Sequence, residues 1–308
     1  MTRRSMASDT ETSRDAFFAE ELETLTRRNA QAINDRAARK NSAEGRLTAV
    51  LACMDERNTL TEEALGLHPS EVRRIATAGG KIAAPDLLNL LGLEKTAGEG
   101  VTLHLVTHEV IGRPDLGCAA FKNDIAAQET FFRGLKDGLA SALPSASIHV
   151  TSMDTSTGAL RAISVDDNDG QFAGFARQGG RPETRCSDEA HAGYGIYVGE
   201  AYRAWNLKRN VYFHITASAP SLAGDLDIAL AVILHHSTVD LSDKPIVLHV
   251  DTPESWDGFP EGASERMDAV VHAFLAKPEV APMAADGSLR VVRTVTDTDT
   301  WRGRLAER

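Results

Sequence analysis

The chain has 308 residues, of which 42% are hydrophobic and 25% are charged, and its formal net charge is −11. This length and composition predict a globular protein with one large or two medium domains. The acidic balance, with no cluster of Lys and Arg beyond residue 40, argues against nucleic acid as a partner. No apolar run approaches the roughly 18 residues of a membrane span. Three cysteines without a secretory signal lead us to expect a cytoplasmic protein.

Hydrophobic periodicity and turn residues predict alternating helices and strands after a polar, basic segment. The expected elements are a disordered tail over 1–14, a helix over 16–39, strands over 47–52 and 72–76, a helix over 83–93, a strand over 101–107, a helix over 119–143 and a strand pair over 147–163. This alternation predicts an α/β fold with a mostly parallel sheet flanked by helices.

A segment rich in Gly, Asp, Asn, Gln and Arg follows these elements and indicates a linker over 167–185. We therefore expect an N-terminal tail and helix over 1–44, an α/β unit over 45–166 and a second unit over 186–308.

The second unit echoes the first in several segments, in the same order and at similar spacing. The matching segments are Cys53-Met-Asp-Glu with Cys186-Ser-Asp-Glu, Ile75–Gly80 with Ile215–Pro220, and Leu103–Glu109 with Leu248–Glu254. Such repeats predict a duplicated α/β unit. The alternative is two unrelated halves that share only the alternation of strands and helices.

Three metal-binding residue types fall at the ends of predicted strands in the first unit. Cys53 ends one strand, His108 ends another, and Cys118 follows just before a helix. Ligands collect at the carboxyl ends of strands in open α/β sheets. Two thiolates and one imidazole leave a fourth tetrahedral position free, which is typical of catalytic zinc. The spacing alone is also compatible with two buried cysteines and a core histidine.

His104 is the rival ligand, because it shares a strand face with His108. The repeat decides between them: the second unit keeps a counterpart of His104 in His249 but has Pro253 in place of His108. A unit that lacks the site yet keeps this histidine indicates a structural role for His104. We interpret Cys186 of the second unit as a relic or a packing residue.

Asp55 and Arg57 alternate with Cys53, so in extended backbone all three side chains point the same way. An Asp held by an Arg stays ionised and can orient the water at a catalytic zinc. The alternative is a surface ion pair, which would be unusual directly after a buried strand.

These residues resemble the β-class carbonic anhydrases over about residues 45–165. The resemblance rests on Cys53-Met-Asp55-Glu-Arg57, on Ala78-Gly79-Gly80, on His108 and Cys118, and on the hairpin Met153–Leu160. Two features depart from the family. Ala76-Thr77 replaces an Arg-Asn pair, and Cys118 follows His108 after a longer insert over 109–117. This insert and the degenerate second half are similar to the carboxysome shell type, although the large helical N-terminal domain of that group is missing.

The resemblance implies a zinc enzyme that hydrates carbon dioxide to bicarbonate, with Cys53, His108 and Cys118 as ligands. Asp55 and Arg57 would be catalytic, and amides near Gly79 and Gly80 would bind substrate. Two alternatives stay open: hydrolysis of carbonyl sulfide or carbon disulfide at the same zinc, and non-catalytic binding of zinc or bicarbonate. The resemblance also implies a pseudo-dimer within one chain, and whole chains could pair further.

Overall fold

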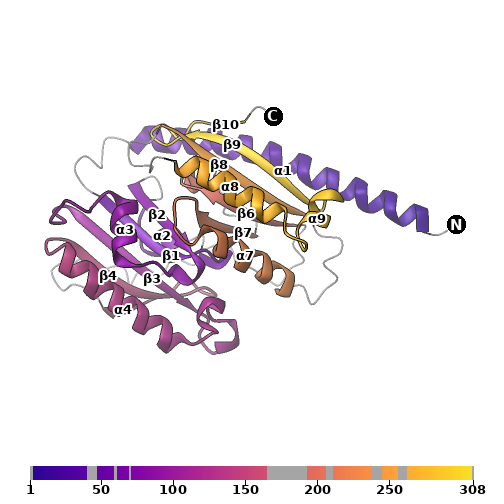
Figure 1. The fold of residues 1–308 in the computed structure, drawn as a ribbon. Coiled ribbons are helices and arrows are strands. Elements are labelled where there is room, and N and C mark those ends of the chain that lie inside the picture. Colours follow the sequence, from indigo (N-terminus) through magenta and orange to yellow (C-terminus); the bar gives the residue numbers. More distant parts are fainter. Residues whose placement is uncertain are drawn as a thin grey trace.

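The computed structural model contains two α/β units that lie side by side (Figure 1). The described residues are 3–39, 47–58, 61–68, 71–164, 193–205, 211–236, 245–255 and 262–306. The expected linker over 167–185 lies outside them. Within the described segments, no helix has both the length and the apolar character needed to cross a bilayer.

Five strands form the first sheet, in the order β2-β1-β3-β4-β5. Their bounds are β1 Leu47–Cys53, β2 Val72–Thr77, β3 Val101–Glu109, β4 Ser147–Asp154 and β5 Leu160–Ser164. The first four are parallel, and β5 returns antiparallel to β4. Each parallel strand begins at the predicted residue. The apolar run of β1 is typical of a strand covered on both faces, whereas β2 and β4 mix apolar and polar residues.

Helices and short 3-10 turns connect these strands. They are α2 Thr61–Ala64, α3 Ala84–Leu91 and α4 Ile125–Ala142, with turns η1 Glu56–Asn58, η3 Ala78–Gly80, η4 Pro114–Leu116 and η5 Ala119–Phe121. α4 begins later than predicted, because Lys122 and Asn123 have positive φ and the Asp124 carboxylate accepts a hydrogen bond from the Ala127 amide. That cap satisfies an amide of the first turn and sets the start of the helix.

The second sheet has the same strand order, β7-β6-β8-β9-β10. Its strands are β6 Tyr194–Gly199, β7 Val211–Thr216, β8 Ile246–Ser255, β9 Leu289–Asp297 and β10 Gly303–Leu305, with helices α6 Tyr202–Trp205, α7 Leu222–His236, α8 Ala263–Leu275 and α9 Ala281–Ala285. Again four strands are parallel and the last is antiparallel. The predicted α/β fold and its duplication are confirmed.

The strand register identifies equivalent residues of the two units. In the first sheet Leu51 pairs with Ile75, and in the second Val198 pairs with Ile215. The predicted echo of Ile75 in Ile215 therefore follows the fold, and Leu51 corresponds to Val198.

The same register corrects the predicted echo of Cys53 in Cys186. Two residues beyond Leu51 and Val198, the counterpart of Cys53 is Glu200. Cys186 precedes β6 and lies outside the described residues, as does Asp188. A four-residue similarity cannot reveal the register, which backbone pairing determines. The second unit thus has a carboxylate where the first has its thiolate.

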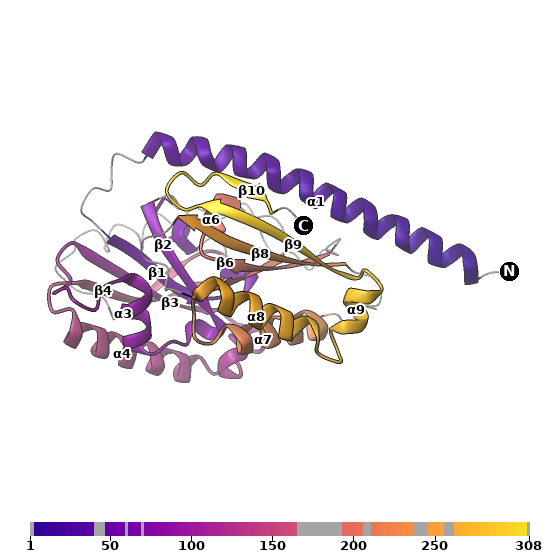
Figure 2. The ribbon, with the colours of Figure 1, turned by 45° about the horizontal axis from the view of Figure 1, so that its top comes forward.

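The N-terminal helix α1 spans Arg3–Arg39, so the prediction of a disordered tail over 1–14 is wrong. The tail sequence is polar but contains no Gly or Pro to end a helix. Figure 2 shows α1 lying along the second unit, beside α6, β9 and β10, with its N-terminal end projecting beyond them. The Asn29 side chain fixes this arrangement: its Nδ2 donates to the carbonyls of Ala204 and Trp301, and its Oδ1 accepts from the Gly303 amide.

The two units meet where the edge strands β2 and β7 face each other. The Ala76 amide donates to Thr216 Oγ1 at 2.8 Å, and the His214 amide donates to the Met54 carbonyl at 3.0 Å. Met54 and Ala76 are buried in the apolar core of the second unit. The contact between the two similar units therefore lies within one chain, next to the end of β1.

Candidate metal centre

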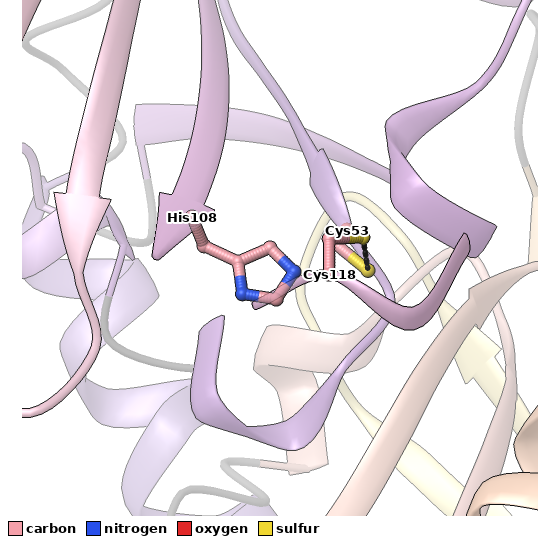
Figure 3. Close-up of side chains that lie close together, drawn as sticks. All are labelled: Cys53, His108 and Cys118. Carbon is pink, nitrogen blue, oxygen red and sulfur yellow. Dashed lines mark hydrogen bonds between the residues drawn. The ribbon is translucent and has the colours of Figure 1, made fainter. Parts of the chain in front are cut away.

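Two neighbouring parallel strands bring the predicted ligands together. Cys53 is the last residue of β1, His108 lies near the end of β3, and Cys118 directly precedes η5. Their ligand atoms all lie within 4.8 Å of one another, and all three side chains are buried. In Figure 3 the His108 ring points toward the two sulfur atoms. Within the described residues, this is the one group of His, Cys, Asp and Glu identified as able to hold a metal ion.

The geometry of this group fits a tetrahedral zinc ion. Two zinc–thiolate bonds of about 2.3 Å place their sulfur atoms about 3.8 Å apart. Cys53 Sγ and Cys118 Sγ lie 3.9 Å apart, too far for a disulfide. The His108 side chain is fully buried and its ring interacts with the Cys53 thiol, but neither ring nitrogen has a hydrogen-bond partner of good geometry. Buried nitrogens of this kind normally have a partner, and a metal ion would supply one.

The two thiols influence each other's protonation. Their mutual hydrogen bond, followed by burial, raises the pKa of Cys53 well above its ordinary value. The same bond lowers the pKa of Cys118, and the amides of Ala120 and Phe121 lower it further. Of the two thiols, Cys118 is therefore the more acidic, and Cys53 holds its proton more strongly. A divalent cation would displace that proton, because coordinated thiols ionise.

Asp55 and Arg57 form an ion pair beside this group. Arg57 Nε donates to Asp55 Oδ1 at 2.8 Å, and Nη2 donates to Oδ2 at 2.6 Å. Burial alone would raise the pKa of Asp55, but the charge and hydrogen bonds of Arg57 outweigh burial and hold it well below its usual value. The backbone here is not extended as predicted. It turns into η1, and the Arg57 amide also donates to Asp55 Oδ1.

Arg57 also holds the insert over 109–117, a role that sequence reasoning missed. Its Nη1 donates to the Leu116 carbonyl at 2.7 Å, and Nη2 lies 3.4 Å from the Gly117 carbonyl. These carbonyls directly precede Cys118, whereas the middle of the insert is open to solvent, with Ile111 68% exposed. Every residue has a backbone carbonyl, so no sequence feature indicated that Arg57 would bind those of Leu116 and Gly117.

The Ala-Gly-Gly turn packs against the residues that follow Cys118. Gly79 and Gly80 have φ of 68° and 67°, a region that other residues rarely adopt. A Cβ added to Gly79 would lie 2.8 Å from the Ala120 Cβ. The Gly79 amide donates to Cys53 Sγ at 3.2 Å, so its hydrogen is bound by a candidate metal ligand. Substrate binding by the Gly80 amide stays a prediction.

The other candidates of the sequence lie away from this group. The ring of His104 packs beside that of His149, with centroids 5.2 Å apart. In the second unit, His249 hydrogen-bonds Thr294 Oγ1 at 2.7 Å inside the core. Both arrangements agree with a packing role for His104, and the structure joins His108 rather than His104 to the cysteines.

Asp225 of the second unit contacts the Ala-Gly-Gly turn beside this group, a contact that sequence reasoning missed. Its Oδ1 accepts a hydrogen bond from the Ala78 amide at 2.9 Å, across 147 residues of sequence. The available signal was an acidic residue in the first turn of an otherwise apolar helix, α7. Acidic residues are common in the first turn of a helix because they interact favourably with its N-terminus. The hydrogen bond between Asp225 and the Ala78 amide could therefore not be inferred from the sequence.

No protein-family model and no curated protein matches this sequence. Among solved structures, β-carbonic anhydrase isoform I from the protozoan Trichomonas vaginalis is similar, at 19% identity and a TM-score of 0.30, over 41% of this chain and 86% of that one. A carbonic anhydrase from Glaciozyma antarctica is similar at 23% identity and a TM-score of 0.26, over 41% of this chain and 88% of that one. At such values the likeness assigns no activity to this chain.

Proposed function

We propose that the chain is a zinc-dependent carbonic anhydrase that hydrates carbon dioxide reversibly to bicarbonate. One observation supports the proposal. The ionised Asp55 carboxylate lies beside two thiols and one imidazole, a set of ligands that leaves zinc one open coordination position. Asp55 is close enough for charge interactions with both His108 and Cys118. A purely structural zinc site would have a fourth protein ligand, and no fourth His, Cys, Asp or Glu of the described residues joins the group.

Cys53, His108 and Cys118 would hold the zinc. A zinc ion bound here would keep a position for water and lower the pKa of that water toward about 7. The two thiolates donate negative charge and oppose this fall in pKa, so a well-placed hydrogen-bond acceptor matters. Asp55 is that acceptor and orients the water oxygen toward carbon dioxide, while Arg57 keeps Asp55 anionic and fixed. We assign stabilisation of the developing bicarbonate to the Gly80 amide.

The test compares Asp55→Asn with a matched control on the zinc-loaded protein. Stopped-flow hydration of carbon dioxide should fall about 10- to 100-fold in Asp55→Asn, while zinc content stays unchanged. Asp115→Asn makes the same chemical change on the insert, where the carboxylate is 61% exposed, and should have no effect. Equal activity in Asp55→Asn and the wild type would refute the assigned role.

The same preparation separates the two alternatives. Hydrolysis of carbonyl sulfide or carbon disulfide, without hydration of carbon dioxide, would identify the sulfur analogues as substrates. The solvent-exposed insert beside Cys118 is the part of the site that could alter substrate choice in this way. Zinc bound at one equivalent with no turnover of any of the three would indicate a zinc- or bicarbonate-binding protein.

A further inference from the structure

The second unit holds the backbone around the metal centre of the first, although its own equivalent of Cys53 is a glutamate. Three of its residues hydrogen-bond backbone groups next to the centre. His214 holds the Met54 carbonyl, Thr216 holds the Ala76 amide, and Asp225 holds the Ala78 amide. Met54 lies between Cys53 and Asp55, so these bonds act on the chain segment that carries the ligand and the carboxylate.

Asp225 is the acceptor best placed to set the geometry of the thiolate. It is 2% exposed, and its second oxygen accepts from Ser221 Oγ at 2.7 Å, which fixes the orientation of the carboxyl group. The amide it binds belongs to Ala78, and the next amide along the chain, that of Gly79, donates to Cys53 Sγ. A hydrogen bond across the interface and one to the metal ligand therefore originate from consecutive peptide groups.

Two consecutive amides point at two different acceptors only if the turn keeps its backbone conformation. The left-handed φ of Gly79 provides that conformation, but glycine also adopts many others. The Asp225 bond removes this freedom, because any other conformation of the turn would cost the buried Ala78 amide its hydrogen bond. Loss of the acceptor would leave the Ala78 amide buried without a partner.

We propose that Asp225 is a positioning residue for the metal centre: it fixes the Ala-Gly-Gly turn so that the Gly79 amide stabilises the Cys53 thiolate. The proposal rests on zinc binding by the first unit, which belongs to the proposed function. It gives the second unit a role in metal affinity, carried out without a ligand of its own.

The experiment measures zinc affinity by competition with a chromophoric chelator, in the full-length protein. Asp225→Ala should weaken zinc binding about 10- to 100-fold, the usual effect of losing a group that orients a ligand. Asp225→Asn should bind zinc almost as the wild type does, because its Oδ1 still accepts from the Ala78 amide and its Nδ2 can donate to Ser221. Asp227→Ala, on the exposed side of the same helix where it contacts Lys277, should leave the affinity unchanged.

A cobalt-substituted protein gives a second readout. The sulfur-to-cobalt charge-transfer band should shift in Asp225→Ala and not in Asp227→Ala, since only the former changes the hydrogen bond to the Cys53 thiolate. Wild-type zinc affinity in Asp225→Ala, or equal losses in Asp225→Ala and Asp225→Asn, would overturn the proposal.

If Asp225→Ala does not fold, Ser221→Ala decides the question. It frees the carboxylate to rotate, so several-fold weaker zinc binding supports the proposal and unchanged binding overturns it. These outcomes are independent of catalysis. A protein that binds zinc in this Asp225-dependent way but does not hydrate carbon dioxide would contradict the proposed function and leave the positioning role intact.

Discussion

Apart from the three candidate ligands, Arg57 is the side chain whose removal should disturb the site most, because it joins two parts of the chain. Its guanidinium donates two hydrogen bonds to the Asp55 carboxylate and one to the Leu116 carbonyl at 2.7 Å. Arg57→Ala would leave Asp55, which is 8% exposed, with one backbone donor. It would also remove the hydrogen bond that holds the Leu116 carbonyl, two residues before Cys118.

The expected loss in free energy of unfolding follows from the burial of the Asp55–Arg57 ion pair. Breaking a buried ion pair by removing one partner costs about 3–5 kcal/mol. The side chains of Arg57 and Asp55 keep 15% and 11% exposure, so we expect the lower end, about 3 kcal/mol. Arg57→Lys can bind Asp55 with one amine but cannot bind both carboxylate oxygens and Leu116 together. It should lose part of this stability and most of the carbon dioxide turnover.

Urea unfolding of the zinc-loaded protein measures the stability, and stopped-flow hydration measures the turnover. Arg133→Ala is the matched control: its guanidinium pairs with Glu129 at 3.6 Å on the surface of α4, and its loss should cost less than about 1 kcal/mol. The reasoning would be refuted if Arg57→Lys matched the wild type in both stability and turnover, since the bidentate geometry would then be unnecessary.

Four further outcomes are expected. Metal analysis should give close to one zinc per chain, and two equivalents would contradict the assignment of a metal-free second unit. Gly79→Ala should weaken zinc binding, because its Cβ would collide with Ala120 and with Phe121 at 2.9 Å; unchanged affinity by chelator competition would refute this. Burial lowers the pKa of His249 from 6.5 to about 3, so between these values only the unfolded chain binds a proton at this residue. The free energy of unfolding should therefore fall by about 2 kcal/mol from pH 6.5 to about pH 5. His249→Asn should flatten this part of the curve of urea midpoint against pH. A fragment ending near residue 170 should be insoluble or self-associated with little activity, because it exposes the β2 edge; a stable, active monomer by light scattering would be incompatible with that view.

Much of the fold and the ligand group was predictable because both depend on local pattern. Apolar runs such as Leu47–Cys53 mark strands buried on both faces. Parallel strands end at the same edge of a sheet, so Cys53 and His108 at two strand ends imply a meeting of their side chains. The pairing of Asp55 with Arg57 is also local, although its geometry comes from a 3-10 turn rather than from an extended strand.

Tertiary structure alone decided the features that depend on register and on contacts between distant segments. The counterpart of Cys53 is Glu200 because hydrogen-bonded pairing determines equivalence, which a four-residue similarity does not. The bond from the Ala78 amide to Asp225 joins positions 147 residues apart, through a backbone donor that every residue except proline carries. The sequence therefore determines which side chains could hold a metal ion, and the packing of the two units determines which backbone groups beside them are hydrogen-bonded across the interface.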